Sequence, residues 1–151
     1  MSKQKEISLS YKIADIKTVR FTYEEIPVEE VEAVFLNIEQ INFTVNMGTN
    51  FNLENSTFTL DVKTGLSLKS EPAKLLVEHI ARTVYGIKDM DALLTADKES
   101  INIPELFLKQ LYGISFSHAR ALLAVELSPT NYKGKYILPV VDPAILLPHN
   151  D

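Results

Sequence analysis

The sequence predicts an α+β fold in which a broken, apolar helix in the C-terminal half packs on one face of a β-sheet formed by the N-terminal half. Before residue 70, apolar and polar residues alternate at period two, which is typical of half-buried strands. After residue 104, apolar residues instead recur at the spacing of one helical stripe. With 151 residues, of which 46% are hydrophobic, the chain is long enough to bury the core of one domain, residues 1–151.

The main helical stripe begins after Ser115, whose side-chain oxygen suits a helix N-cap because it can accept from the free N–H groups of the first turn. Gly113 separates this stripe from a shorter apolar run at residues 104–112. That run begins with Pro104, and proline suits a helix start because its missing N–H needs no partner there. We therefore expect two helical pieces with a break at Gly113. The apolar stripe consists of Phe116, Ala119, Leu122, Leu123 and Leu127.

Strand patterns cover residues 7–24, 41–47 and 56–69, with a bulge or bend expected at 14–17 and a turn or twisted connection at 48–55. The clearest pattern is 56–69, where apolar side chains on one face predict contact with a core. Residues 28–39 fit either a helix or an irregular acidic lead-in. Residues 74–87 fit a helix and a strand about equally, and local pattern leaves both open. An extended segment with two prolines is expected at 136–143.

Composition excludes several classes of function. The net charge of −5 argues against a nucleic-acid-binding surface, since phosphates require clustered Lys and Arg. The absence of cysteine excludes disulfides and thiolate chemistry. No run of 18 apolar residues exists, so we expect no membrane insertion. Residues 1–6 are polar and predict a flexible tail without a secretory signal, which fits a cytoplasmic protein.

Catalytic patterns are scarce, so we expect neither an enzyme nor a cofactor or metal site. The histidines share no ligand spacing, and His79 and His118 are expected to be structural. No glycine-rich phosphate loop and no Gly-x-Ser-x-Gly motif occurs. An acidic cluster could be a solvated face or could bind a metal or a basic partner. The surplus of apolar residues is instead typical of an oligomer interface or a binding groove. The acidic cluster consists of Glu24, Glu25, Glu29, Glu30 and Glu32.

The C-terminal block, residues 111–143, resembles the SecB-like chaperones, in which a helix with an aromatic-x-x-Ala-Arg core, here Phe116 to Arg120, precedes a loop and an extended proline-containing segment. Residues 76–87, with Leu76 and Glu78 followed by Tyr85, resemble the family's fourth strand. The resemblance spans residues 7–147. It implies a four-stranded antiparallel sheet with the helix on one face, a strand at 74–87, and a homo-oligomer that is a tetramer, or dimer of dimers.

The resemblance also implies a function. Proteins of this family hold unfolded polypeptide in apolar grooves without ATP, either for protein export or for a dedicated client such as an antitoxin. Glu24, Leu76 and Glu78 match positions where the family binds the translocation motor SecA. Arg20 replaces a family acid, and little sequence follows Pro143 where the family has a final helix. The implied client-binding residues are Phe116, Leu123, Tyr112, Tyr85 and Phe58.

Two hypotheses from different classes follow. The first is a holdase-type chaperone whose clients are unfolded polypeptides. The alternative is an oligomeric adaptor or structural protein that binds one folded partner through an acidic sheet edge. Suppression of aggregation discriminates between them.

Overall fold

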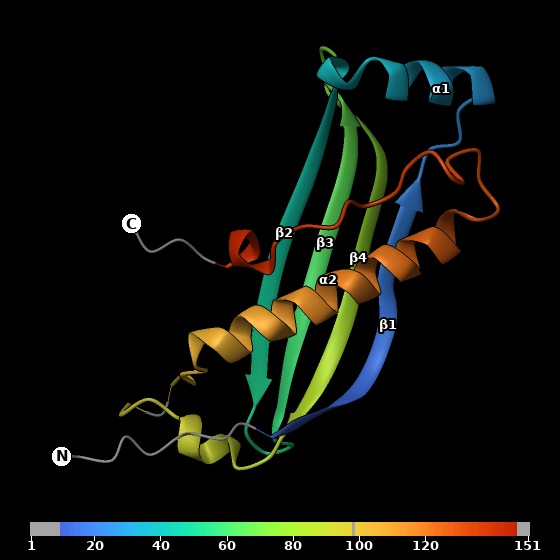
Figure 1. Cartoon of the computed structure of the whole chain (residues 1–151). Coiled ribbons are helices and arrows are strands. Elements are labelled where there is room, and N and C mark those ends of the chain that lie inside the picture. The colour runs from blue at the N-terminus through green and yellow to red at the C-terminus, as the bar shows by residue number, and fades with distance from the viewer. Residues whose placement is uncertain (1–9, 98, 148–151) are drawn as a thin grey trace.

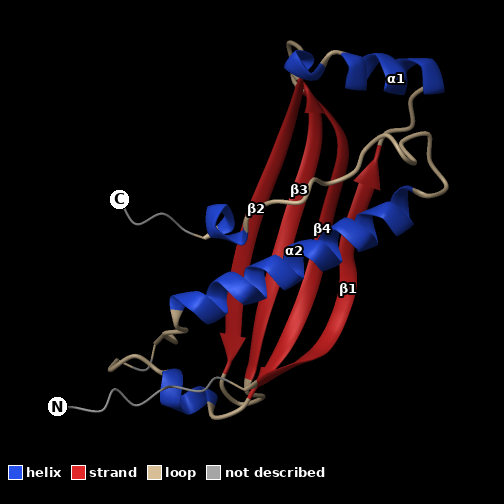
Figure 2. Cartoon of the chain, viewed as in Figure 1, coloured by secondary structure: helices blue, strands red, loops and turns tan. Residues whose placement is uncertain are grey.

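Four antiparallel strands form a single sheet in the order β1-β4-β3-β2, crossed on one face by a long helix (Figures 1 and 2). The computed structural model describes residues 10–97 and 99–147. This architecture confirms the α+β prediction and the four-stranded antiparallel sheet. The expected tail at residues 1–6 and the expected start of the first strand at residue 7 lie outside the described residues. The strands are β1 (Tyr11–Tyr23), β2 (Ile41–Asn52), β3 (Thr57–Leu68) and β4 (Lys74–Ile87).

The helices connect the strands and cover one face of the sheet. α1 (Val28–Leu36) and the 3-10 helix η1 (Ile38–Gln40) lie at one end of the sheet, between β1 and β2 in the chain (Figure 1). η2 (Met90–Leu93) follows β4, α2 (Glu105–Leu127) crosses the sheet, and η3 (Pro143–Leu146) comes last. The ambiguous region 28–39 is therefore mostly helical, and the ambiguous region 74–87 is a strand.

The strand choice at β4 has a tertiary cause. β4 pairs with β1 on one side and with β3 on the other, so both of its edges are hydrogen-bonded. Along most of its length, alternate residues face α2 and are buried, which is the period-two reading of the sequence. Pairing on both sides and burial under a helix outweigh a weak local preference. The side chains buried beneath α2 are Val77, His79, Ala81, Thr83, Tyr85 and Ile87.

The predicted break in the helix is wrong. α2 runs without interruption through Gly113, and Ser115 is a buried residue in its middle rather than a cap. The Ser115 hydroxyl lies 2.7 Å from the Tyr85 hydroxyl of β4, so its polarity serves a contact with the sheet. Gly113 is required by close packing, because a Cβ there would lie 2.9 Å from Cγ of Pro143. The helix does begin where Pro104 predicts.

The turn predicted at 48–55 is also too long, since β2 continues to Asn52. Phe51 pairs with Phe58 of β3, and aromatic cross-strand pairs favour extension of a ladder. The bulge predicted at 14–17 is confirmed by a register shift between Ile13 and Asp15. A second shift, between Thr18 and Arg20, was not predicted.

The core lies between α2 and the middle of the sheet. β3 contributes Phe58, Leu60, Val62 and Leu66, all at most 4% exposed. After α2 the chain is anchored by Tyr132, whose hydroxyl donates to the carbonyl oxygen of Glu24 at 2.6 Å. This anchor directs the following residues back over the helix-covered face.

Candidate functional site

An apolar cavity of about 650 Å³ lies between β2, the middle of α2 and the segment that follows α2. In Figure 1 this last segment, coloured red, crosses in front of the sheet towards β2. None of the lining residues carries a charge. A cavity of this size with apolar walls is typical of a binding site. The lining residues are Phe43, Thr44, Val45, Asn46, Met47, Tyr112, Phe116, Tyr136, Ile137, Leu138, Pro139, Val141, Ile145 and Leu146.

The cavity exists because α2 packs mainly on β4 and β3 and leaves the helix-side face of β2 uncovered. Phe43 and Val45 on that face remain 49% and 42% exposed. Tyr136 covers part of this face, since its ring centroid lies 6.0 Å from that of Phe43 and 6.3 Å from that of Phe35 in α1. Burial raises the pKa of Tyr136 to about 12, so its hydroxyl is neutral at physiological pH.

Residues 136–147, here called the C-terminal strap, form the outer wall of the cavity. In the described part of the chain, no backbone hydrogen bond links residues 137–141 to the sheet or to α2. Ile137 and Val140 are 63% and 84% exposed. The strap is held instead by packing of Pro143 on Gly113 and by a turn in which the Asp142 carboxylate accepts from Ala144 N–H at 2.9 Å. Such a wall can move at low cost.

The five residues expected to bind clients fall into two groups. Tyr112 and Phe116 line the cavity, and Tyr112 also lines a second, more polar cavity of about 430 Å³ together with Phe58. Tyr85 and Leu123 are instead core residues, at 0% and 1% exposed. Tyr85 donates to the carbonyl oxygen of Leu111 at 3.0 Å. A client could reach either of these two side chains only if α2 moved.

The most exposed part of the cavity wall was not predicted as a binding site. The sequence predicts Phe43, Val45 and Met47 only as part of a strand at 41–47, and it predicts residues 136–143 of the strap only as an extended segment. No local signal marks β2 as an edge strand, because the strand order is a tertiary property. The proline-containing pattern of the strap was the one signal that could have suggested a covering segment.

The three residues expected to bind a partner do meet at one end of the β1–β4 pair. Glu24 N–H donates to the carbonyl oxygen of Leu76 at 2.8 Å. Leu76 is only 1% exposed, which leaves the two carboxylates as the available groups. Glu24 pairs with Lys74 at 3.0 Å, and Glu78 lies 3.8 Å from both Arg20 and Lys63. These cations offset the acidic character of this surface.

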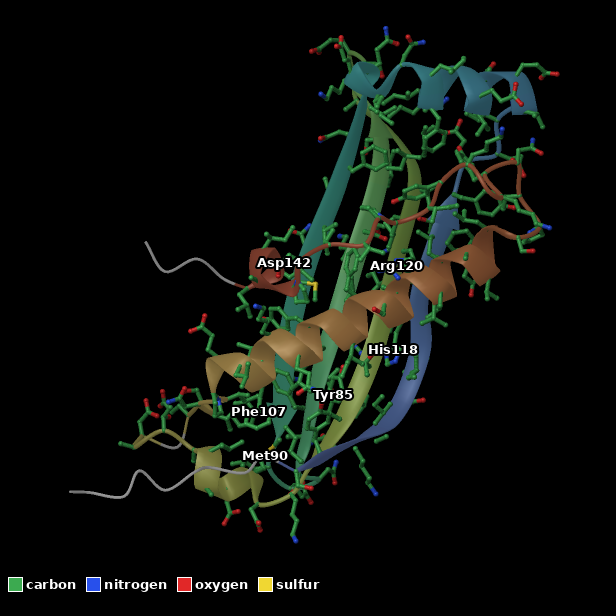
Figure 3. The ribbon with its side chains drawn as sticks, in the orientation of Figure 1. Tyr85, Met90, Phe107, His118, Arg120 and Asp142 are labelled. Carbon is green, nitrogen blue, oxygen red and sulfur yellow. The ribbon has the colours of Figure 1, made fainter. Side chains whose placement is uncertain are left out.

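The histidines that are described make structural contacts. His79 is fully buried, and its Nε2 lies 2.9 Å from the Thr18 hydroxyl; burial lowers its pKa to about 4. His118 Nδ1 lies 2.9 Å from the Thr83 hydroxyl, and burial lowers its pKa as well. Figure 3 labels His118 on α2. Neither has a carboxylate partner among the described residues.

Several carboxylates of the acidic cluster on and before α1 have partners within the chain. Within residues 10–97 and 99–147, no group of three or more His, Asp or Glu side chains is arranged to hold an ion. Glu24 and Glu32 pair with lysines instead, and the Glu25 carboxylate accepts from Asn131 N–H at 3.1 Å. No described helix has the length and apolar character needed to span a membrane.

A four-stranded antiparallel sheet, one long helix across it and an apolar groove at the sheet edge together define a SecB-like fold. A solved structure with this fold is that of the Mycobacterium tuberculosis Rv1957 SecB-like chaperone in complex with a ChAD peptide from the Rv1956 HigA1 antitoxin. The match covers 87% of each chain with a TM-score of 0.52 and 9% sequence identity, so it shows the fold alone.

A second structure, a protein of unknown function from Streptococcus agalactiae, is 9% identical and covers 87% of this chain and 98% of that one. Its TM-score of 0.39 is too low to support an argument. No protein-family model and no curated protein matches the sequence.

Proposed function

We propose that this protein is an ATP-independent, holdase-type chaperone that binds unfolded or extended polypeptide in the apolar cavity beneath the C-terminal strap. The observation that carries the proposal is the uncharged wall of that cavity, which includes the half-exposed β2 residues Phe43 and Val45. A wall without charges or a specific polar pattern accepts many side chains, because it contributes contact area rather than sequence readout.

The expected affinity is moderate and reversible. Burial of apolar surface stabilises a complex by about 25 cal/mol per Å² before the costs of ordering the client are subtracted. The half-exposed side chains of Phe43 and Val45 and the exposed side chain of Ile137 offer such surface. The Rv1957 structure supports the proposal at the level of the fold, since that protein is bound to an antitoxin peptide. An antitoxin is therefore one candidate class of dedicated client, and export cargo delivered to SecA is the other.

We further propose that the chain acts as a homo-oligomer, a tetramer arranged as a dimer of dimers. Leu106 and Val125 on the outer face of α2 are 76% and 70% exposed. Exposed apolar residues along a helix that already covers a sheet favour burial in an interface. Light scattering that gives the mass of a monomer at micromolar concentration would contradict this assembly.

A client-aggregation assay without ATP tests the chaperone proposal. The chain should suppress aggregation of a chemically denatured client at stoichiometric amounts. Phe43→Asp places a charge in the cavity wall and should abolish suppression, whereas Asn42→Asp adds the same charge to the opposite face of β2 and should preserve it. Circular dichroism verifies that both variants fold. No suppression by the parent protein in stoichiometric excess, or equal suppression by both variants, would reject the proposal.

The adaptor alternative has weaker support, because the acidic side chains of Glu24 and Glu78 already pair with cations. It would gain support if the protein captured one folded partner and left denatured clients unaffected.

A further inference from the structure

We infer that the polypeptide held by this protein joins its sheet as a fifth strand, pairing its backbone with the free edge of β2. This inference rests on the proposed function and specifies how the client is bound. Edge-strand addition obtains affinity from main-chain hydrogen bonds and obtains selectivity from alternate side chains. Three observations about the edge support it.

The first observation is the difference between the two edges of the sheet. A free edge strand is a template for another strand, and proteins usually protect it with charges, prolines or bulges. β1 has such protection: it contains Lys12, Asp15, Lys17 and Arg20 and two register shifts. β2 contains no charged residue, no proline and no register shift over its twelve residues. β2 therefore lacks the protection that β1 has and is the better suited of the two edges to pair with a further strand.

The second observation is that the cavity lies along a continuous run of β2. Its lining includes five consecutive residues, Phe43 to Met47, although alternate side chains of a strand point to opposite faces. β2 pairs with β3 alone, so the backbone of this run is unpaired along its other edge. Four consecutive strap residues, Tyr136 to Pro139, line it as well. The cavity therefore runs along about 13 Å of β2, since four steps of roughly 3.3 Å each separate Phe43 from Met47.

The third observation is charge. No side chain that lines the cavity is ionised, so a charged occupant would lose hydration without gaining a partner. The complementary occupant is an extended, uncharged segment whose apolar side chains alternate. One set would pack beside Phe43, Val45 and Met47, and the other set would extend the polar outer face that carries Asn42 and Asn46.

Backbone-modified peptides test this inference. The probe is a capped hexapeptide that alternates valine with threonine and carries a fluorophore at one end, with binding followed by fluorescence anisotropy. In one version the three valines are N-methylated, and in the other the three threonines are. Successive N–H groups of a strand point to opposite edges, so only one version removes the donors that face β2. The two versions are matched controls for each other in composition and stiffness.

We expect one version to bind at least about tenfold more weakly than the unmodified peptide and the other to bind nearly as well. Three hydrogen bonds are lost in the first case, each worth roughly a factor of 2 to 10 in affinity. Alternate amides of β2 should gain protection from hydrogen exchange in the complex.

Two results would overturn strand addition while leaving the chaperone proposal intact. One is equal affinity for both methylated versions, which would indicate binding by side chains alone. The other is suppression of aggregation without any binding of the unmodified hexapeptide. If neither peptide binding nor suppression occurs, both proposals fail.

Discussion

The buried His79 predicts that the fold loses stability between pH 7 and pH 5. The ring of this β4 residue is fully buried, with Phe21 of β1 at a ring-centroid distance of 6.2 Å and one contact to the Thr18 hydroxyl. Its Nδ1 has no hydrogen-bond partner in the described structure. Burial lowers the pKa from 6.5 to about 4, because the site disfavours the charged ring.

The sign and size of the effect follow from linkage. The unfolded chain protonates this histidine near pH 6.5, whereas the folded chain does so only near pH 4, so the unfolded state binds more protons in between. Stability is therefore present above pH 6.5 and is lost as the pH falls towards 4. The two pKa values give a loss of about 2 kcal/mol between pH 7 and pH 5, and about 3 kcal/mol in full.

Urea denaturation at the two pH values measures this loss. His79→Gln removes the titrating group and should reduce the difference in unfolding free energy between pH 7 and pH 5 by about 2 kcal/mol. His118→Gln is the matched control. Its pKa is lowered in the same direction, but the residue is only partly buried, so its removal should have the smaller effect. An unchanged pH dependence in His79→Gln would refute the burial argument.

Three further outcomes are expected. Gly113→Ala should gain less than the usual ~1 kcal/mol of helix propensity because its methyl group meets Pro143, and limited proteolysis should then cut the strap faster than in the parent. Tyr85→Phe should lower the unfolding free energy in urea by about 1–3 kcal/mol, since it leaves buried polar groups of α2 without their partner. Asp61→Asn removes one side of the paired contact with Arg82, at 2.8 and 2.9 Å, and should cost at most about 1 kcal/mol, with a smaller loss in high salt.

The strands could be predicted from the sequence wherever one face is buried along its whole length. β3 shows this best, since Phe58, Leu60 and Val62 alternate with polar residues and are buried as expected. β4 could not be assigned locally, because its apolar residues satisfy both periods and its pairing partners are distant in sequence. The local patterns at Gly113 and Ser115 mislead for the same reason. Each has a local meaning, a break and a cap, but in the fold each serves a tertiary contact.

The site was predictable in kind but only in part by residue. An apolar surplus predicted a groove, and two of the five expected residues, Tyr112 and Phe116, line it. Tyr85 and Leu123 carry the same apolar signal but lie in the core, because hydrophobicity alone does not separate a core residue from a groove residue. What separates a groove residue from a core residue is its position beside β2, and the place of β2 at the sheet edge follows from the strand order.

The strand order also explains why the groove and its cover occur together. β2 is an edge strand, so one of its edges has no neighbouring strand. α2 packs mainly on β4 and β3, so the helix-side face of β2 is left largely uncovered by this helix. The strap covers this face by side-chain packing, without backbone hydrogen bonds from residues 137–141 in the described structure. A client strand that pairs with β2 would gain the hydrogen bonds that the strap does not make. Because opening free energies are lowest where hydrogen bonds and buried contacts are few, the strap is the element that we expect to yield first.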